Sequence, residues 1–236
     1  TQDILKTLES IGFEWDGDVV YQQNNQKDYQ NMLEQLSAKQ LTYPCVCSRK
    51  NLPNGVYPRT CKNTQIEMSK QHSIRLLTTN EIIFINDLFQ GEYCQNLECD
   101  IGDFVVYRAD KMFSYHLATV VDDYHTGITH IIRGVDLLDS TPRQIYLQQI
   151  LEFDTPIYGH LPIAVNHQGK KLSKQTFAKA IDNDNLTKEL IDALNFLGQK
   201  TVKELPDAKP KEILDWGIKY WDKKRVPKID TLIYNE

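Results

Sequence analysis

The sequence lacks the features that would place a protein in a membrane or on an export route. No stretch approaches the roughly 18 consecutive apolar residues of a membrane-spanning helix. The chain opens with TQDILKTLES, which is polar and acidic where a signal peptide carries a basic region and then an apolar run. We therefore expect no membrane partner and a cytoplasmic location.

A basic excess is also absent. The chain has 27 lysine and arginine residues against 32 aspartate and glutamate residues, which gives a formal net charge of −5. Proteins that bind nucleic acids gain much of their affinity by neutralising phosphates with basic side chains. The charge therefore argues against a pure DNA- or RNA-binding module and predicts no DNA partner, but it permits an enzyme with a local basic patch.

Cysteine is scarce and unevenly placed. Of five cysteines, Cys45, Cys47 and Cys61 lie within 17 residues. This spacing suits a metal site better than disulfides, and it indicates a reducing compartment. Thiolates are strong zinc ligands, although inert buried cysteines or a redox pair would give the same pattern. On chemistry alone the fourth ligand would be His72, because imidazole is far commoner on zinc than phenolate.

The pattern of apolar residues predicts an α/β domain followed by a small helical region. Helical periodicity occurs at 3–11, 28–39, 115–121, 141–151, 186–197 and 210–220. Gly12 and Gly198 are expected to end the first and the fifth of these helices. Short apolar or β-branched runs predict strands at 41–47, 74–77, 82–85, 104–107, 129–132 and 161–165. Thr141 and Gln144 have the spacing of a capping box, with Pro142 at the first helical position.

A lysine-rich turn follows the last predicted strand. Lys171 and Lys174 lie three residues apart with Ser173 between them, after a glycine turn. Such donors can contact the oxyanions of a triphosphate and stabilise the charge that accumulates when a carboxylate attacks the α-phosphate. The alternative is a solvated surface loop, because lysines usually lie outside. No G-x-x-x-x-G-K-[ST] motif occurs, which argues against a P-loop nucleotide site.

Arg133 leaves a predicted strand beside Gly134. Strand ends are where open α/β sheets place ligands, and a guanidinium presents a planar set of donors to a carboxylate or phosphate. The alternative is a local salt bridge to Asp122, Asp123 or Asp136.

Several stretches together resemble the class I glutamyl-tRNA synthetases. They are IGDFVVYR at 101–108, FSYHLA at 113–118, VDD at 121–123 and GITHIIRG at 127–134. The stretch LLDSTPRQIYLQ at 137–148 looks specifically like the queuosine branch of that group. The lysine turn resembles the second class I signature loop, with Leu172 in place of its usual methionine and Gln175 in place of its final serine. The resemblance is dense up to residue 182 and thin afterwards.

The resemblance implies a fold and an activity. The fold is a Rossmann-like catalytic domain over 1–185, with a zinc-bearing insertion at about 42–75, followed by a helical region over 186–236 where an anticodon-binding domain would otherwise follow. The activity is the activation of L-glutamate with ATP and Mg²⁺, without tRNA, and the transfer of the glutamyl group to the queuosine base at the wobble position of tRNA(Asp).

The resemblance also implies the site residues. Tyr115 and Arg133 would contact glutamate, whose carboxylates suit a phenol hydroxyl and a guanidinium. The ATP-binding residues would be Lys171, Leu172, Ser173, Lys174 and Gln175, with Lys171 and Lys174 in catalytic roles. The family pattern C-x-C followed by Y-x-x-x-C matches this sequence and implies one structural zinc ion on Cys45, Cys47, Tyr57 and Cys61. His72 stays open as the alternative to Tyr57.

Some features of the family have no match. The stretch from Gly159 to Leu161 superficially resembles the first class I signature, a histidine-containing stretch that opens a helix, but it precedes a predicted strand and we reject it. The true first signature, together with an N-terminal Arg and Glu that help to hold glutamate, has no match, since the family begins with a strand and helix upstream of the position of Thr1. Cys94 and Cys99 are expected to be packing residues.

Two other functions stay open at this point. One is a truncated glutamyl-tRNA synthetase that charges the tRNA 3′ end. The other is a non-catalytic, zinc-stabilised tRNA-binding module.

Overall fold

The computed structural model describes residues 2–48, 52, 55–67, 69–173, 178–203 and 205–234. The helices are α1 (Gln2–Ile11), α2 (Gln26–Ala38), α3 (Leu97–Asp100), α4 (Tyr115–His125), α5 (Thr141–Leu151), α6 (Leu186–Phe196) and α7 (Pro210–Tyr220). The strands are β1 (Thr42–Cys45), β2 (Ser73–Leu76), β3 (Ile82–Asp87), β4 (Gly91–Asn96), β5 (Phe104–Tyr107), β6 (His130–Gly134), β7 (Ile157–Leu161), β8 (Ile163–Val165) and β9 (Thr231–Ile233). Short 3-10 helices include η4 (Val135–Ser140) and η7 (Lys223–Arg225).

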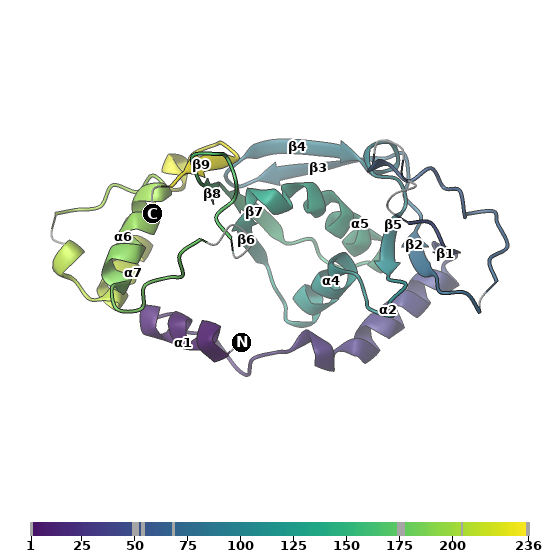
Figure 1. The fold of residues 1–236 in the computed structure, drawn as a ribbon, viewed down its shortest axis with the longest axis horizontal. Helices are drawn as coiled ribbons and strands as arrows, with labels where there is room; N and C mark the ends of the chain where they lie inside the picture. The colour runs from purple at the N-terminus through teal and green to yellow at the C-terminus, as the bar shows by residue number, and fades with distance from the viewer. Residues whose placement is uncertain are drawn as a thin grey trace.

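The strands form four small sheets that follow one another along the molecule (Figure 1). An antiparallel sheet in the order β1-β2-β5 occupies one end, and the antiparallel hairpin β3–β4 runs along one side of the molecule. The pairs β6–β7 and β8–β9 are parallel. The crossover from β6 to β7 runs through η4 and α5, so this part of the chain is a βαβ unit of the kind found in α/β domains.

The main hydrophobic core lies where α2, α4 and α5 meet the sheets. Its most deeply buried members are at most 1% exposed and include Leu36, Leu76, Val106, Leu117 and Leu147. Burial of one such side chain stabilises the fold by about 1.5–3 kcal/mol. This core fixes the positions of the N-terminus of α4 and the carboxyl end of β6, where the predicted glutamate-binding residues lie.

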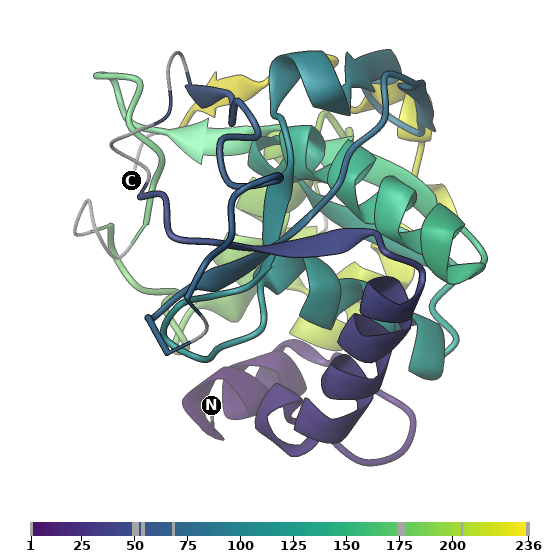
Figure 2. The same cartoon turned by 90° about the vertical axis from the view of Figure 1, so that its right-hand side faces the viewer.

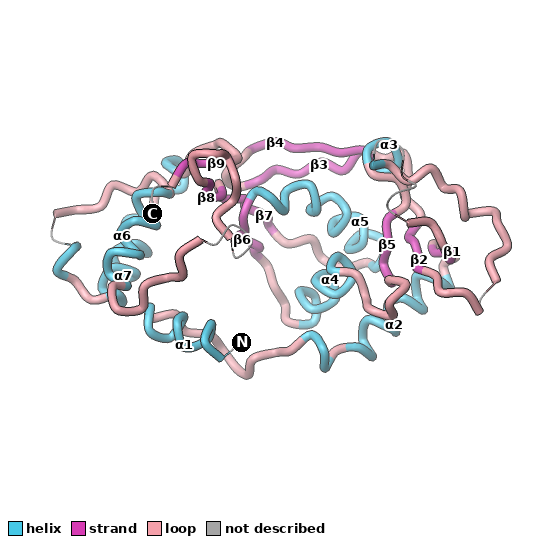
Figure 3. The backbone as a smooth tube through the Cα atoms, viewed as in Figure 1, coloured by secondary structure: helices cyan, strands magenta, loops and turns pink. Residues whose placement is uncertain are grey.

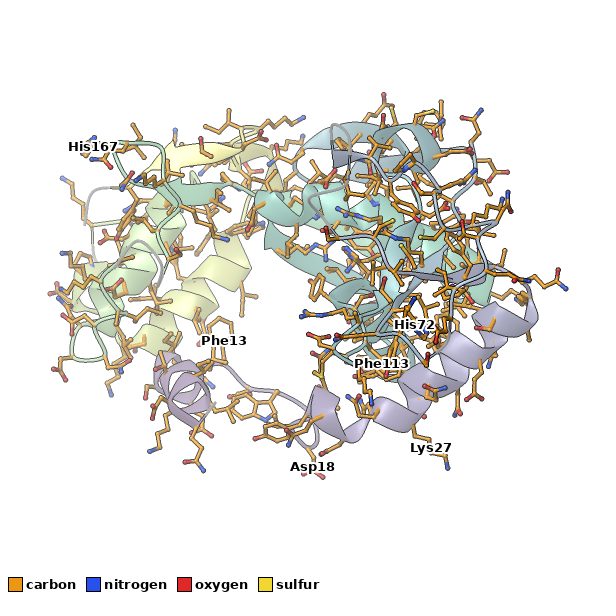
Figure 4. All side chains as sticks on the ribbon, turned by 45° about the vertical axis from the view of Figure 1, so that its right-hand side comes forward. Phe13, Asp18, Lys27, His72, Phe113 and His167 are labelled. Carbon is orange, nitrogen blue, oxygen red and sulfur yellow. The ribbon has the colours of Figure 1, made fainter. Side chains whose placement is uncertain are left out.

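Parts of the N-terminal and C-terminal regions lie together at the opposite end of the molecule, where Figure 3 shows α1, α6 and α7 as neighbouring helices. Helix α1 packs on α7, and Glu14 forms an ion pair with Lys211 at 2.8 Å. From there the segment between α1 and α2, which carries Phe13 and Asp18, crosses to the other end of the molecule (Figure 4). The last strand, β9, pairs with β8 and so returns the C-terminal region to the body of the protein (Figure 2).

The predicted helices are confirmed within a few residues, and α7 has the predicted bounds. Gly12 ends α1 as expected, with the Phe13 N–H donating to the Leu8 carbonyl at 3.0 Å, and Gly198 follows α6 with φ +74°. Strand β5 also has its predicted bounds. The sequence did not predict β4, α3, β7 or β9; of β7 only Leu161 lies in a predicted strand. No helix in the part of the chain that the structure describes is long and apolar enough to cross a membrane.

Two local predictions are corrected. The capping box is wrong, because Ser140 is the N-cap of α5 and makes no side-chain cap, while the Thr141 and Gln144 side chains bind Arg133 instead. The rejection of a signature at Gly159 is confirmed, since this residue opens no helix. Gly159 and His160 lie inside β7, however, rather than before a strand.

Candidate active site and metal centre

Arg133 is held at the carboxyl end of β6 by neutral partners. Its Nε–H donates to His160 Nε2 at 3.0 Å. Its Nη2 donates to Thr141 Oγ1 at 2.8 Å and to Gln144 Oε1 at 2.7 Å, both on the first turn of α5. No carboxylate pairs with Arg133 within the described ranges, so the alternative of a local salt bridge is wrong for these residues.

His160 also contacts a buried carboxylate through its other ring nitrogen. Its Nδ1 lies 2.6 Å from Asp87 Oδ2, and both side chains are 0% exposed. Because arginine has only donors, His160 Nε2 accepts, and the proton on Nδ1 is donated to Asp87. Burial alone would raise the pKa of Asp87, but hydrogen bonds from His160 and from the backbone of Gln90, His160 and Phe89 lower it to about 2. Asp87 therefore stays ionised.

One side of the Arg133 guanidinium is left open. Across the residues that the structure describes, no protein group accepts from either N–H of Nη1. Tyr115, the first residue of α4, is 49% exposed. Tyr115, Arg133 and Asp123 all lie close enough to Tyr158 to influence its pKa, which burial raises to about 12. Arg133 lies over the ring of the buried Tyr158, with its guanidinium carbon 5.3 Å from the ring centre, and the electrostatic influence on Tyr158 places Tyr115 in the same region.

The lysine turn lies beside this site. Lys171 bridges to Val165 of β8, and the Leu172 N–H donates to the Ala164 carbonyl at 2.9 Å. The ammonium of Lys171 forms a 2.5 Å ion pair with Asp136 Oδ2. Asp136 lies in η4, directly after the strand that carries Arg133. The lysine turn and the carboxyl end of β6 are therefore neighbours in the fold, although they are far apart in the sequence.

Of the other four predicted ATP-binding residues, the structure describes Leu172 and Ser173. Leu172 and Ser173 line a cavity of about 430 Å³ that Ile181 and Tyr234 also line. Lys174 and Gln175 lie outside the described residues, and their predicted roles stay predictions.

The three clustered cysteines come together as a possible metal centre. The sulfur atoms of Cys45, Cys47 and Cys61 all lie within 4.8 Å of one another, and those of Cys47 and Cys61 are 3.4 Å apart. Two thiolates on one tetrahedral zinc ion lie about 3.8 Å apart, because each Zn–S bond is about 2.3 Å. The Tyr57 hydroxyl lies 3.2 Å from Cys45 Sγ and accepts from the Cys61 N–H at 3.0 Å. The donor set fits a zinc ion.

The pKa values of the thiols indicate a site that a bound cation would stabilise. Burial, together with the neighbouring thiols of Cys61 and Cys45, raises the pKa of the Cys47 thiol to about 11. Burial acts the same way on Cys61, but hydrogen bonds from the Tyr57 hydroxyl and the Val46 backbone lower its pKa to about 7. Ionising all these groups together places like charges side by side, which a bound cation would offset.

A buried arginine completes this centre. Arg75 is only 6% exposed, and its guanidinium lies 3.7 Å from the centre of the Tyr57 ring. Its Nε–H donates to Cys45 Sγ at 3.1 Å and its Nη1 to the Asp103 carbonyl at 2.6 Å. No carboxylate pairs with Arg75 in the described ranges. A buried cation needs a nearby acceptor of its hydrogen bonds, and Cys45 Sγ and the Asp103 carbonyl take that place.

The loop that carries Tyr57 is fixed to the body of the protein. Arg59 Nε donates to the fully buried carboxylate of Asp103 at 3.0 Å. Gly102 has φ +72°, and a Cβ there would lie 2.3 Å from the Tyr57 carbonyl oxygen, so only glycine admits this close approach. The cluster is therefore preorganised rather than assembled by a loose loop.

The remaining candidate residues lie elsewhere. His72 is not part of the cysteine cluster; its Nδ1 lies 2.8 Å from the Lys70 carbonyl and the ring lines a separate hollow with Tyr107. Cys94 and Cys99 are both exposed, so the prediction that they pack in the interior is wrong.

Sequence reasoning missed several residues of both sites. No role was predicted for Asp87 or Arg75, His160 was considered only as part of the rejected signature, and Thr141 was assigned to a cap. His160 lies between Gly159 and Leu161 outside every predicted strand, so no local pattern marked it as a buried residue that needs a partner.

Comparisons with known proteins agree with this geometry. The model of the family described as tRNA synthetases class I (E and Q), catalytic domain, matches residues 1–205. A protein of Neisseria meningitidis serogroup A named glutamyl-Q tRNA(Asp) synthetase is 46% identical over 237 residues, covering 95% of this chain and 79% of that protein. One of the same name from Ectopseudomonas mendocina is 42% identical over 231 residues, covering 97% of this chain and 78% of that protein.

Solved structures match in fold. A glutamate tRNA ligase from Elizabethkingia meningosepticum superimposes with a TM-score of 0.76 at 21% identity, covering 99% of this chain and 57% of the other. The glutamate-tRNA synthetase of Elizabethkingia anophelis gives a TM-score of 0.75 with the same identity and coverage. This chain therefore spans little more than half the length of those two proteins. It belongs to the glutamyl-Q tRNA(Asp) synthetase family, ligases built on the catalytic domain of class I tRNA synthetases.

Proposed function

We propose that this protein activates L-glutamate with ATP, without tRNA, and transfers the glutamyl group to the queuosine base at the wobble position of tRNA(Asp). The observation that carries the proposal is Arg133, which is fixed at a strand end by His160, Thr141 and Gln144 with its Nη1 open within the described residues. The curated relatives that cover most of the chain carry a name that fits this activity.

Arg133 and Tyr115 bind the side-chain carboxylate of glutamate. The α-carboxylate is the nucleophile of the first step, and a guanidinium bound to it would neutralise its charge. The cation therefore belongs on the other carboxylate, which it distinguishes from the neutral amide of glutamine. Within the described residues only the Nη1 side of Arg133 is free for this contact, so Tyr115 supplies a second donor.

The reaction has two steps. An oxygen of the α-carboxylate forms a bond to the α-phosphorus of ATP, the bond to the β-phosphate oxygen breaks, and pyrophosphate leaves. A queuosine hydroxyl oxygen then attacks the glutamyl carbonyl carbon, AMP leaves, and the hydroxyl proton passes to water. The lysine turn 171–175 holds the phosphates, with Lys171 and Lys174 stabilising the negative charge of the first step and Mg²⁺ accompanying ATP.

Zinc takes a structural role on Cys45, Cys47, Tyr57 and Cys61. Cys45 and Cys47, at and just after the end of β1, and Tyr57 and Cys61, in the loop at 55–67, would hold the ion, which would tie these two segments together. The geometry favours Tyr57 over His72, whose ring contacts the Lys70 backbone instead.

Glutamate-dependent exchange between ATP and pyrophosphate tests the first step. We expect exchange without tRNA, and a fall of about 100-fold in its rate on Lys174→Ala because a phosphate contact is lost. Lys200→Ala, a lysine on the exposed C-terminal side, is the matched control. Unchanged exchange in Lys174→Ala would refute the assigned role of the turn.

The acceptor requires a second test. The tRNA(Asp) 3′ end is blocked, and transfer of labelled glutamate is compared for tRNA with and without queuosine. Transfer only to the queuosine-containing, 3′-blocked tRNA supports the proposal. Charging that occurs only when the 3′ end is free would instead support a conventional glutamyl-tRNA synthetase.

A further inference from the structure

The pair Asp87–His160 lies behind Arg133 and has no role in the chemistry proposed above. We propose that Asp87 and His160 are positioning residues for glutamate, which fix the plane and the direction of the Arg133 guanidinium. This inference rests on the proposed glutamate-binding role of Arg133 and deepens it.

The contact from His160 constrains the orientation of the Arg133 side chain. An arginine side chain has four rotatable bonds, and a donor set aimed at a ligand is useful only if they are fixed before the ligand arrives. A bond to Nε fixes the guanidinium plane in a way that bonds to Nη2 alone do not. His160 makes that bond at 3.0 Å, while Thr141 and Gln144 hold Nη2. The open Nη1 then points in one direction only.

Asp87 sets the direction of the hydrogen bond between His160 and Arg133. His160 can accept from Arg133 only if its proton lies on Nδ1, and Asp87 at 2.6 Å holds it there. The opposite tautomer would place an N–H against the Arg133 N–H. Asp87 thus selects the form of His160 that binds Arg133.

Asp87 also supplies a negative charge behind Arg133. Asp87 is ionised and fully buried, and no arginine or lysine pairs with it directly in the described part of the chain. Its negative charge reaches Arg133 through one neutral imidazole ring. The pair therefore stabilises the buried stem of a cation without occupying the Nη1 donors that the ligand needs, as a directly bound carboxylate would.

Hydrogen bonds from the surrounding backbone hold Asp87 and His160 rigidly. Asp87 lies at the turn of the β3–β4 hairpin, where its Oδ1 accepts from the N–H groups of Phe89, Gln90 and His160 at 2.9–3.0 Å. The Gln90 side chain also donates to the His160 carbonyl at 2.8 Å. The hairpin turn and β7 therefore hold both members of the pair in place, and the pair transmits that rigidity to Arg133.

Two substitutions of His160 separate its contacts. In His160→Gln the side-chain oxygen takes the place of Nε2 and still accepts from Arg133, but the bond to Asp87 is lost. In His160→Asn the side-chain nitrogen takes the place of Nδ1 and still donates to Asp87, but the partner of Arg133 is lost. His130→Asn is the matched control, because His130 is an exposed histidine on the same strand as Arg133.

The experiment measures KM for glutamate, KM for ATP and kcat in the pyrophosphate exchange reaction, with the full chain folded in each variant as judged by circular dichroism. We expect His160→Asn to raise KM for glutamate by about tenfold, the effect of losing one charge-assisted hydrogen bond. His160→Gln should stay within about threefold of the unchanged protein, and KM for ATP should stay constant in both. Nitrogen NMR of the imidazole should show the proton of His160 on Nδ1.

The outcomes are distinct. A KM for glutamate that rises equally in both variants, or that rises more in His160→Gln, overturns the inference and leaves the proposed function standing. The same holds if the His160 proton lies on Nε2. If the unchanged protein neither binds glutamate nor catalyses exchange, the proposed function fails and the inference fails with it.

Discussion

Arg133 and Arg75 are anchored in similar ways but face different surroundings. Each lies over a tyrosine ring, Arg133 at 5.3 Å from the centre of Tyr158 and Arg75 at 3.7 Å from that of Tyr57. Each donates from Nε to a side chain of an adjacent strand or sheet, His160 Nε2 in one case and Cys45 Sγ in the other. The stems are thus fixed by the same combination of ring packing and one directed hydrogen bond.

The difference lies in where the remaining charge is directed. Arg75 is buried, and its positive charge faces the thiols of a compact cluster. Arg133 is half-buried and keeps its Nη1 free of the described residues at the end of a strand. An arginine enclosed on every side supports a structural centre, whereas one with an open side is ready for an exchangeable anion.

The largest expected effect concerns the closed centre. Replacing Cys45 and Cys61 together by serine should reduce bound zinc from about one ion per chain to almost none, because a structural zinc site is worth about 10–16 kcal/mol of binding free energy. Elemental analysis of the purified protein measures this. Replacing Cys94 and Cys99 by serine removes the same number of cysteines from exposed positions and is the control. Equal zinc in both variants would remove the proposed centre.

The next effect concerns the open site. Arg133→Leu should lower kcat/KM for glutamate by about 100-fold or more, because it removes a charge-assisted contact and leaves His160 without its donor. Arg133→Lys should restore little, since lysine has no Nε–H to meet His160. Pyrophosphate exchange measures both. Arg108→Leu, which removes an exposed arginine paired with Asp110, should change little; a similar loss in that variant would show that the effect is not specific.

A smaller effect connects the two regions. Arg75→Leu should weaken zinc binding by about 10–100-fold, the range expected when a partner behind a metal ligand is lost. Competition with a chromophoric chelator measures the affinity directly. Glutamate KM should stay unchanged, because Arg75 belongs to the closed centre. A change in glutamate KM with intact zinc affinity would reverse the division between the two arginines.

The smallest effect is a dependence of stability on pH near the open site. Burial lowers the pKa of His116 to about 4, and the positive charges of Arg143 and Arg133 add to the shift. The unfolded chain therefore binds the proton first, so the contribution of His116 is fully present above pH 6.5 and is lost as the pH falls towards 4.

Urea unfolding measures this contribution. Between pH 7 and pH 5 the loss attributable to His116 should be about 1–2 kcal/mol. His116→Phe, which keeps an aromatic ring beside Phe104, should remove that part of the pH dependence. Identical pH profiles for the two proteins would contradict the assigned pKa.

Local patterns predicted most of the helices because their information lies within a few residues. The apolar spacing of α1 and α7 and the glycines after α1 and α6 suffice for that. Strand β4 was missed because its sequence GEYCQN is largely polar, and β9 because three residues carry little signal without their partner β8. The cysteine cluster was predictable because its members are close in sequence.

The open site was predictable only in part. Arg133 and the lysine turn stand out by residue type, but the Asp87–His160 contact joins residues 73 positions apart. Thr141 shows the converse problem: its spacing favours a cap, yet the nearby guanidinium competes for the same hydroxyl and wins. A charged partner outside the helix can override a local rule that the sequence satisfies.

The packing of the N-terminal helix on the C-terminal region has a structural consequence. Because β9 pairs with β8 and α1 packs on α7, the C-terminal region is tied both to the first helix and to the strand that precedes the lysine turn. The segment matched by the family model stops at residue 205, before α7 and β9 begin. A cut at that point would uncover α1 and the edge of β8 at the base of the lysine turn. Helix α7 and strand β9 therefore belong to the packing of the described fold although they lie beyond the segment matched by the family model.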